Sequence, residues 1–410
     1  MIKMKTSVFI LLSIRKHLSQ IDHELERGNS VHIITPCDAD VSIEQFTEER
    51  GEWTSVVTNV RIKDLTALRL ALPNSKKSIE FVFAFEEYCL LPAAYLREQL
   101  GIYGRKPNQV ICFRNKEAMV RSLFAKSPKD VKIPHTERFT GEDQVFAFLS
   151  RYNKVIAKRI DGMGSKDIQI FSRDQTRDEV IALVRRMRKG KTYILQEFIE
   201  GHVYHYDTYI LGGEPIIDNL MEYIEYQCNY KSNKSLTALS VPQCPARNKL
   251  VSAAHEVIRL YELNEVTIHL ELIYDGTSVF FCEIGIRPGG AGVVPAVEAL
   301  YGVDLFEIDY LFQANRSDEV RRCAVEAVEL AGWSVIYPTH GIVTKIRGLE
   351  ELRREKQIKL LSCSIAVGDE LADQQHCASA VLLAVYTAQT HEQLKKIYTT
   401  VYNVFSYDVI

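Results

Sequence analysis

The feature that most constrains the fold is the alternation of short apolar runs with amphipathic stretches over the first hundred residues. Helical spacing of apolar residues covers Arg15–Arg27, closed by Gly28-Asn29, and Glu86–Leu100, which stops at Gly101. Buried strands are expected at Val8–Leu12, Val31–Thr35, Val56–Val60 and Phe81–Phe85. Strands that alternate with helices in this way predict a parallel sheet with helices on both faces.

Two carboxylates, Glu86 and Glu87, directly follow the last of these strands. Ligands in open parallel sheets usually bind beyond the carboxyl ends of the strands, so the two residues are candidates for a binding site. Acidic residues that open a helix also complement its dipole. Both interpretations stay open from the sequence.

The remaining chain has a different pattern. Helices are expected at Glu117–Lys126 and Lys249–Leu260, and a strand hairpin at Thr267–Tyr274 and Val279–Ile284 turns at Asp275–Ser278. Further short strands are expected at Val155–Lys158, Ile168–Phe171, Tyr193–Glu197, Tyr206–Leu211 and Ile216–Asp218. The last region should hold helices at Asp318–Leu330 and Glu392–Val401 and strands at Ser334–Tyr337 and Gly341–Ile346. We therefore predict an α/β chain of three domains, residues 1–102, 103–315 and 316–410.

Composition excludes several classes of protein. Fifty Lys and Arg against 53 Asp and Glu give a net charge of -3, so the basic excess of a nucleic-acid or anionic-membrane partner is missing. The nine cysteines include no CxxC pair, which favours a reducing compartment over a disulfide framework or a zinc cluster. Because the apolar run at Val8–Leu12 is too short for a signal-peptide core or a membrane span, we expect a cytoplasmic protein.

Three common nucleotide-binding or metal-binding motifs are present only in part. Gly190-Lys191-Thr192 ends like a Walker A motif, but Arg185 stands where that motif needs glycine. Gly162-Met163-Gly164 opens like a dinucleotide fingerprint, but Asp167 occupies its third glycine position. The pair His269-x-Glu271 has no Pro-Cys-x-x-Cys after it, as a zinc deaminase requires.

Lys158 and the glycines after it form a weaker phosphate-binding signal. Lys158 ends a predicted strand, and Asp161-Gly162-Met163-Gly164-Ser165-Lys166-Asp167 follows. Backbone N–H groups of a glycine-rich hairpin can close around phosphate oxygens, with the lysine adding charge. A plain β-turn beside a solvated lysine is the alternative.

Glu271 and Glu283 lie on the two strands of the predicted hairpin and can face each other across it. Two carboxylates about 5 Å apart repel by roughly 3 kcal/mol at an effective dielectric constant near 20. A bound Mg²⁺ would remove that penalty, since magnesium prefers carboxylate and phosphate oxygens. Their apolar neighbours argue against the alternative of two surface glutamates with lysine partners.

Arg287 follows Glu283 by four residues, in Arg287-Pro288-Gly289-Gly290-Ala291-Gly292. An arginine beside a metal–phosphate site can neutralise the charge that builds on a transferring phosphoryl group. The glycines after it would let the backbone approach a ligand closely.

In this order the motifs resemble those of the ATP-grasp superfamily, over about residues 80–310. The resemblance is carried by Asn115-Lys116, by Lys158 with its loop, by Gln196 to Gly201, and by Glu271, Glu283 and Arg287. The segment from Phe85 to Gly101 resembles the pre-ATP-grasp domain of the branch that joins amino acids. The fold implied is a Rossmann-like pre-ATP-grasp domain, a two-lobed α+β ATP-grasp domain and a small C-terminal α+β domain.

The resemblance also implies roles for individual residues. Lys116, Lys158 and the loop residues Gly162, Gly164 and Ser165 would hold the ATP phosphates. Gln196, Glu197, Phe198 and Ile199 would read adenine, and Glu271 and Glu283 would bind Mg²⁺, with Mn²⁺ as an alternative metal. Arg287 would be catalytic, and Glu87, Gly289 and Gly290 would contact substrate. The chain departs from the pattern at Gly285, where many relatives have a third metal ligand, Asn, and at Val203, where many have an acidic residue.

The function implied is an ATP-dependent carboxylate ligase of the L-amino-acid ligase branch, which releases ADP and phosphate. It would activate an amino-acid carboxylate as an acyl phosphate for attack by the amine of a second amino acid, in specialised peptide metabolism such as antibiotic biosynthesis. Loading of an acyl carrier protein's phosphopantetheine thiol is an alternative within the fold, and a non-catalytic nucleotide-binding regulator is an alternative of another class. Tyr223–Lys234 and Gly289–Val294 are candidates for the substrate pocket, and homodimers are common in the family.

Overall fold

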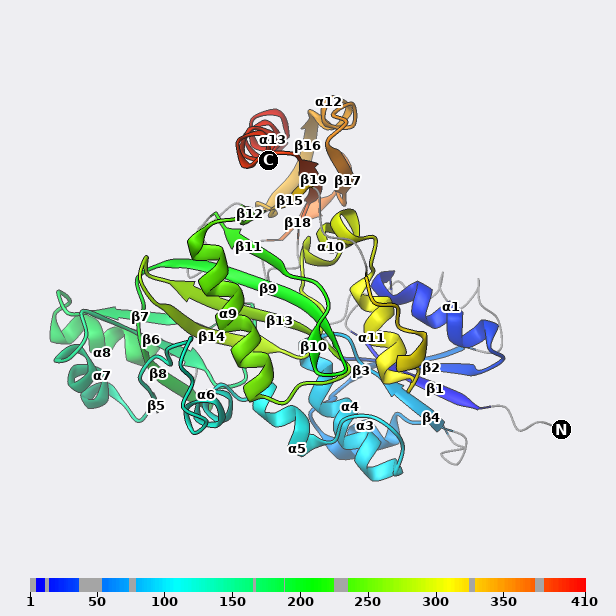
Figure 1. Cartoon of the computed structure of the whole chain (residues 1–410), viewed down its shortest axis with the longest axis horizontal. Helices are drawn as coiled ribbons and strands as arrows, with labels where there is room; N and C mark the ends of the chain where they lie inside the picture. Colours follow the sequence, from blue (N-terminus) through cyan, green and yellow to red (C-terminus); the bar gives the residue numbers. More distant parts are fainter. Residues whose placement is uncertain are drawn as a thin grey trace.

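The computed structural model describes most residues of the chain. It contains three larger sheets, each with its own helices, and a further small sheet at the C-terminus (Figure 1). The described residues are 5–11, 15–36, 54–73, 79–164, 167–187, 189–224, 235–323, 329–372 and 380–410. Leu12, Ser165 and most of Tyr223–Lys234 therefore lie outside the described residues.

The N-terminal part contains the predicted parallel sheet. Its strand order is β3-β2-β1-β4, and all three pairings are parallel. The strands are β1 (Thr6–Ile10), β2 (Ser30–Pro36), β3 (Thr54–Val60) and β4 (Ile79–Phe83). The expected strands and their parallel arrangement are confirmed within a few residues.

Helices cover both faces of this sheet because alternate residues of β1 point to opposite sides. Val8 and Ile10 pack with the helices α3 and α4, whereas Phe9 packs with α1 and α11. The elements are η1 (Arg15–His17), α1 (Leu18–Glu26), α3 (Leu65–Leu70), α4 (Glu87–Leu100) and α11 (Leu305–Gln313). A helix more than two hundred residues away in the sequence thus completes the N-terminal layer (Figure 1).

A four-stranded antiparallel sheet forms a separate lobe in the order β5-β8-β6-β7. Its own small core joins it to two helices through residues such as Val145, Phe171 and Val180. The elements are β5 (Thr136–Arg138), α7 (Glu142–Leu149), β6 (Lys154–Arg159), β7 (Gln169–Ser172), α8 (Arg177–Arg186) and β8 (Tyr193–Glu197). Three short helices lead to this lobe from α4: α5 (Pro107–Val110), η4 (Ile111–Phe113) and α6 (Lys116–Phe124).

The largest sheet has nine strands and follows the path β14-β13-β9-β11-β12-β15-β19-β17, with β10 beside β9. The helix α9 (Pro245–Leu260) covers one face, where Leu250, Ala253 and Val257 pack in the same cluster as Ile268 and Leu270 (Figure 1). The first strands are β9 (His202–Leu211), β10 (Glu214–Pro215), β11 (Asn219–Tyr223), β12 (Ser235–Ser240), β13 (Val266–Tyr274) and β14 (Val279–Gly285). The expected hairpin of β13 and β14 is confirmed.

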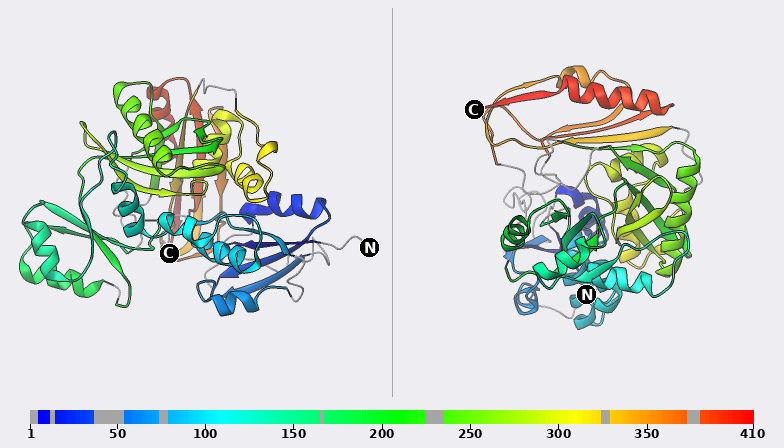
Figure 2. Two further views of the ribbon diagram at one scale, coloured as in Figure 1. Left: turned by 60° about the horizontal axis from the view of Figure 1, so that its bottom comes forward. Right: turned by 90° about the vertical axis from the view of Figure 1, so that its left-hand side faces the viewer.

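The C-terminal strands extend this same sheet, because β12 pairs with β15 over Ser235 to Leu239. The helices α10 (Val293–Tyr301) and α13 (His391–Val404) pack against β15 and β19 (Figure 2). The other elements are η6 (Ser317–Glu319), β15 (Leu330–Ile336), β16 (Gly341–Arg347), α12 (Leu349–Leu352), β17 (Ile358–Cys363), β18 (Glu370–Leu371), β19 (Leu382–Ala388) and β20 (Ser406–Val409). The expected boundary at residue 316 therefore falls between two strands of one continuous sheet, β14 before it and β15 after it.

Two expected elements are wrong. In place of a helix over Asp318–Leu330, the described residues contain only the 3-10 turn η6, and Leu330 already begins β15 opposite Ala388. Residues 324–328 of the expected helix lie outside the described residues. In place of a strand at Ile216–Asp218, β10 ends at Pro215, which has no N–H for a ladder, and β11 starts at Asn219.

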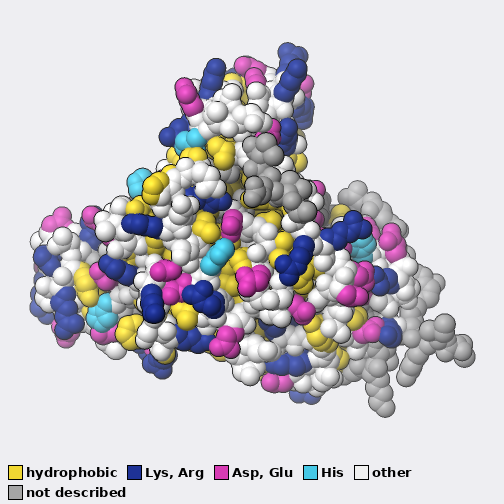
Figure 3. Space-filling model, viewed as in Figure 1, with side chains coloured by type: hydrophobic (Ala, Val, Ile, Leu, Met, Phe, Trp, Pro, Cys, Tyr) yellow, Lys and Arg dark blue, Asp and Glu magenta, His cyan; other side chains and the backbone are white. Residues whose placement is uncertain are grey.

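Within the described residues, no helix is long and apolar enough to cross a membrane. Figure 3 shows Lys and Arg side chains mixed with Asp and Glu over the visible face. That mixture agrees with the near balance of charges in the sequence.

Candidate active site

The two acidic residues of the hairpin face each other in the structure. Glu271 of β13 is the register partner of Glu283 of β14, and a bulge follows Glu271. Directly opposite residues of an antiparallel pair have their Cβ atoms about 5 Å apart. The side chains are 22% and 24% exposed, so both carboxylates lie in a partly desolvated site.

Lys116 is the first residue of α6, and its side chain lies against Glu283 of this pair. Asn115 caps the helix by accepting from the Ala118 N–H at 3.0 Å, and the Lys116 N–H donates to Ile160 O at 2.9 Å. The Lys116 ammonium then forms an ion pair with Glu283. Burial alone would lower the pKa of Lys116, but Glu283 and Glu87 raise it above its usual value, so the lysine stays charged.

Glu87 is held between two guanidinium groups at the start of α4. It forms ion pairs with Arg114 and, at 2.7 Å, with Arg287. Burial alone would raise the pKa of Glu87, but Arg114, Arg287 and Lys116 lower it to about 2. Its neighbour Glu86 contacts His17 Nε2 at 3.1 Å instead. Glu87, unlike Glu86, therefore belongs to the cluster that contains Lys116 and Arg287.

Lys158 reaches the same place from the smaller sheet. Its Nζ atom lies 3.9 Å from Cys282 Sγ, next to Glu283 on β14. The loop after β6 places Gly162 in a buried position and gives Gly164 a φ of 56°, which favours glycine. Arg159 closes this loop by ion pairs with Asp161 at 2.8 Å and Asp167 at 3.0 Å. The loop's ends are thus fixed next to Lys158.

The segment Gln196–Ile199 runs along the smaller sheet. Gln196 is buried and donates to Thr136 Oγ1 at 2.8 Å, while Glu197 accepts from the His135 N–H at 3.3 Å. The Phe198 N–H donates to Lys154 O at 3.3 Å, and Ile199 is buried. These contacts fix the strand that carries the segment, and its role in reading adenine stays a prediction.

The glycines after Arg287 differ from each other. A Cβ atom at Gly289 would lie 2.5 Å from Val293 Cγ1 and 2.8 Å from Asp207 Oδ1, whereas one at Gly290 would meet open space. Gly289 therefore lets the loop pack on Asp207. Gly290 is exposed and could approach a ligand.

Several charged residues of the site were not predicted from the sequence. Arg114 precedes the Asn115-Lys116 motif and pairs with Glu87. His269 was considered only within a deaminase motif, yet it shares a face of β13 with Glu271 and lies 3.7 Å from it. Burial alone would lower the pKa of His269, but Asp207 at 2.7 Å and Glu271 raise it to about 10. The spacing of two along a strand was the signal available for His269.

The donor set fits a hard cation at Glu271 and Glu283, because both offer carboxylate oxygens on one face of the hairpin. Gly285, where a third ligand was expected from the family pattern, lies opposite His269 and contributes no side chain. His205, Asp207 and His269 also bring potential ligand atoms within 4.8 Å of one another. The Nδ1 atoms of both histidines already contact the Asp207 carboxylate, at 2.5 and 2.7 Å, whereas the buried Nε2 atom of His205 has no hydrogen-bond partner among the described residues.

Neither a family model nor a curated protein matches the sequence. Solved structures do match over nearly the full length. An L-amino acid ligase from Bacillus licheniformis superposes with a TM-score of 0.76 at 16% identity, covering 99% of each chain. A phosphoribosylglycinamide synthetase from Anaerococcus prevotii gives 0.70 at 13% identity, covering 99% of this chain and 100% of that one.

A further structure is the biotin carboxylase domain of the Hydrogenobacter thermophilus 2-oxoglutarate carboxylase, which was solved with MgADP, ADP and bicarbonate. It gives a TM-score of 0.67 at 15% identity, covering 100% of this chain and 91% of that chain. At these identities the likeness establishes the fold alone. The chain therefore has the ATP-grasp fold that the order of its motifs predicted.

Proposed function

We propose that the protein is an ADP-forming, ATP-dependent ligase that activates an amino-acid carboxylate as an acyl phosphate and joins it to the amine of a second amino acid. One observation carries the proposal. Of the opposed carboxylates Glu271 and Glu283, the second pairs with Lys116. Lys158 reaches Cys282, which directly precedes Glu283 and lies 3.8 Å from Glu271. The Arg287–Glu87 pair belongs to the same cluster of charges. A site of this kind suits a nucleotide whose phosphates are held by lysines and a divalent cation.

The divalent cation and ATP would supply charge neutralisation and the phosphoryl group. Glu271 and Glu283 would hold Mg²⁺, or Mn²⁺ in its place, and the likeness to a domain solved with MgADP supports this choice. Lys116 now neutralises Glu283 and is charged, so it could turn to a phosphate oxygen when the cation replaces it on the carboxylate. Lys158 and the backbone from Gly162 to Ser165 would bind the same phosphates.

Arg287 would stabilise charge on the transferring group. Its side chain is 17% exposed and forms an ion pair with Glu87, and the residue stands two positions after the end of β14, the strand that carries Glu283. A preorganised cation at the reacting carboxylate lowers the barrier without reorganisation. We assign the catalytic role to Arg287 for this reason.

Amino acids are proposed as substrates because Glu87 is a buried, ionised carboxylate beside two guanidinium groups. Such a set can bind an α-ammonium group through Glu87 and a carboxylate through Arg287. The likeness to an L-amino acid ligase supports the same choice. Gly289, Gly290 and the Gly289–Val294 loop would complete the pocket, and peptide metabolism such as antibiotic biosynthesis would use the product.

The test is to add amino acids singly and in pairs with ATP and Mg²⁺, and to measure ADP, phosphate and peptide. The proposal expects phosphate release that requires a specific pair and yields one dipeptide per ADP. Release of ADP only with a phosphopantetheine thiol would favour carrier-protein loading instead. Binding of ATP without turnover in any combination would favour a nucleotide-binding regulator.

A further inference from the structure

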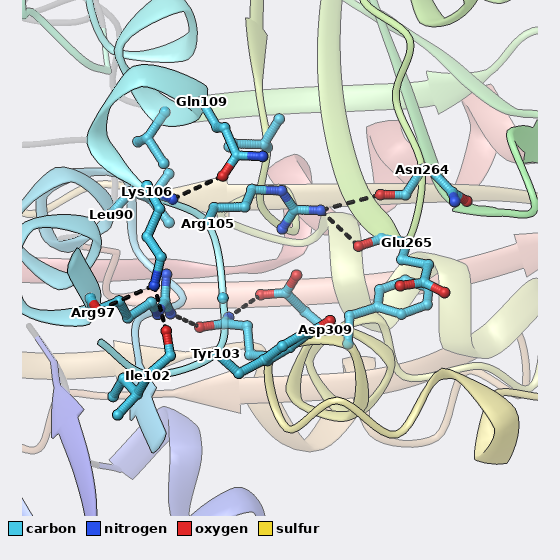
Figure 4. A pocket seen from close by; sticks show the side chains of 15 residues that line it. Leu90, Arg97, Ile102, Tyr103, Arg105, Lys106, Gln109, Asn264, Glu265 and Asp309 are labelled. Carbon is cyan, nitrogen blue, oxygen red and sulfur yellow. Dashed lines mark hydrogen bonds between the residues drawn. The ribbon is translucent and has the colours of Figure 1, made fainter. Parts of the chain in front are cut away.

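A cavity of about 410 Å³ lies away from the acidic pair, between the end of α4, the helix α5, the start of β13 and the helix α11 (Figure 4). None of Lys116, Lys158, Glu271 and Glu283 lines it. Ligand pockets of proteins have volumes of a few hundred Å³ or more, so the cavity is large enough for a small molecule. Its polar lining comes from Arg97, Tyr103, Arg105, Lys106, Gln109, Asn264, Glu265, Asp309 and Gln313.

Three of these side chains keep hydrogen-bond donors available to the cavity. Arg105 uses only Nη2, which donates to Asn264 O at 3.2 Å and to Glu265 O at 2.6 Å. Gln109 uses its Oε1, which accepts from the Lys106 N–H at 2.9 Å, and Asn264 uses its Oδ1, which accepts from the Gly213 N–H at 3.0 Å. Among the described residues, the Nε and Nη1 groups of Arg105 and the amide nitrogens of Gln109 and Asn264 have no acceptor.

Of the two acidic residues that line the cavity, Asp309 is already hydrogen-bonded to other side chains. It is 1% exposed and accepts from Thr267 at 3.0 Å and from Gln313 at 2.7 Å. Arg97 donates to Gln313 Oε1 at 2.6 Å and to Val82 O, so its guanidinium holds Gln313 and β4 together at the wall of the cavity. Arg105, whose charge lies near Asp309 and Glu265, is left as the cation with unused donors.

We propose that this cavity is a second ligand site, which takes a small molecule through its carboxylate group. One carboxylate oxygen can accept from the free Nε–H or Nη1–H of Arg105, whose Nη2 already donates to two carbonyl oxygens. The other oxygen can accept from the amide nitrogen of Gln109 or Asn264, which also line the cavity. The walls are shared with the candidate active site. Leu90 lies one turn along α4 from Glu87, and Ile286 directly precedes Arg287.

The site is therefore regulatory, because an occupant that touches Leu90 and Ile286 contacts both elements that position the Arg287–Glu87 pair. A ligand changes an equilibrium between two arrangements by the difference of its affinities for them. This consequence rests on the proposed ligase activity, whereas the binding site itself does not.

The experiment is calorimetric titration of the nucleotide-free protein with succinate, acetate and inorganic phosphate. Saturable binding of a carboxylate, at least tenfold tighter than phosphate, is expected. Gln109→Glu and Asn264→Asp each keep the oxygen that accepts from the backbone and replace the free amide nitrogen by a charged oxygen. Each should weaken carboxylate binding at least tenfold. The matched control is Gln175→Glu, since Gln175 Oε1 likewise accepts from a backbone N–H, that of Ser172, away from the cavity.

Binding that survives both cavity variants, or is lost equally in the control, would overturn the location. Absence of carboxylate binding, or tighter binding of phosphate, would overturn the ligand class. The titrations contain no ATP, so a failure of carboxylate binding can be distinguished from a failure of the proposed ligase activity. Saturating succinate should also change kcat of the wild-type enzyme but not of Gln109→Glu, and an unchanged wild-type kcat would overturn the regulatory role.

Discussion

At the scale of single residues, the candidate site consists of charges that are stable only because they meet opposite charges. Glu87 is 8% exposed and would be costly to ionise alone, but its two guanidinium partners hold its pKa near 2. Because that pKa is lowered, the stabilisation is present above the usual pKa of a glutamate and is lost as the pH falls toward 2. In the Lys116–Glu283 and His269–Glu271 contacts, too, each charged side chain lies next to an opposite charge.

Glu283→Gln should abolish ATP-dependent phosphate release, because it removes a negative charge that the divalent cation needs and changes little volume. It leaves Lys116 without its ion-pair partner in a site that is only partly buried, so the fold should persist. Glu262→Gln is the control, since the Glu262 side chain is 84% exposed and its ion-pair partner among the described residues is Lys126, away from the site. Circular dichroism would check the fold of both variants. Release at the wild-type rate by Glu283→Gln at ordinary magnesium would contradict the metal assignment.

Arg287→Met should lower kcat by about 10²–10³ while ATP affinity changes little, because the guanidinium acts where charge develops in the transition state. Glu87 keeps its ion pair with Arg114 in this variant, which protects the fold. Steady-state kinetics with calorimetry of ATP binding separates the two effects. A raised KM for ATP at constant kcat would instead make Arg287 a clamp for the bound nucleotide.

Asp309→Asn should change the pH dependence of stability. Burial raises the pKa of Asp309 from 3.8 to about 6, despite the nearby Arg105 and Arg97 and hydrogen bonds from Thr267 and Gln313. A raised pKa stabilises the folded chain at low pH, and this stabilisation is lost as the pH rises from about 4 through 6. The unfolding free energy of the wild type relative to the variant should thus fall by about 2 kcal/mol between pH 4 and pH 7. Urea denaturation at several pH values would show it, and a constant difference would contradict it.

At the scale of elements, local patterns predicted more than distant pairings did. The β13–β14 hairpin and the facing of Glu271 and Glu283 could be predicted because a short turn fixes the register of its strands. The expected helix at Asp318–Leu330 is wrong at both ends, because η6 ends at Glu319 and Leu330 pairs with Ala388 of β19, a strand that lies far away in the sequence. Arg114 and Asp207 were missed because Glu87 and His269, which they contact, come from other elements of the fold.

Gly332→Ala should destabilise the sheet where β12, β15 and β19 meet. An added Cβ atom would lie 2.3 Å from Tyr386 Cε2 and 2.7 Å from Leu239 Cδ2, so buried side chains would have to move. Overpacking of this kind typically costs about 1–3 kcal/mol. Gly290→Ala is the control, because a Cβ atom there meets nothing within 4 Å. Equal melting temperatures for the two variants would contradict the close packing at Gly332.

At the scale of the whole molecule, the chain places its site where three layers meet. The N-terminal sheet contributes Glu87 through α4, the smaller antiparallel sheet contributes Lys158, and the large sheet contributes the acidic pair and Arg287. The parallel sheet could be predicted from the sequence. The packing of α11 on that sheet and the extension of the nine-stranded sheet by the C-terminal strands could not. Those features depend on packing between segments that no local pattern connects. Domain boundaries and a homodimer stay predictions.

The most direct test of the central proposal is the transfer of oxygen from the substrate carboxylate to phosphate. An amino acid labelled with ¹⁸O in its carboxylate would be supplied with its partner amino acid, ATP and Mg²⁺, and the released phosphate would be analysed by mass spectrometry. Phosphorylation of the carboxylate breaks the P–O bond to ADP, and amine attack then expels the carboxylate oxygen with the phosphate. The account predicts one ¹⁸O atom per phosphate released, and none with Glu283→Gln because that variant should not turn over. Phosphate that contains no label, released at the rate of peptide formation, would contradict activation of a carboxylate by this site.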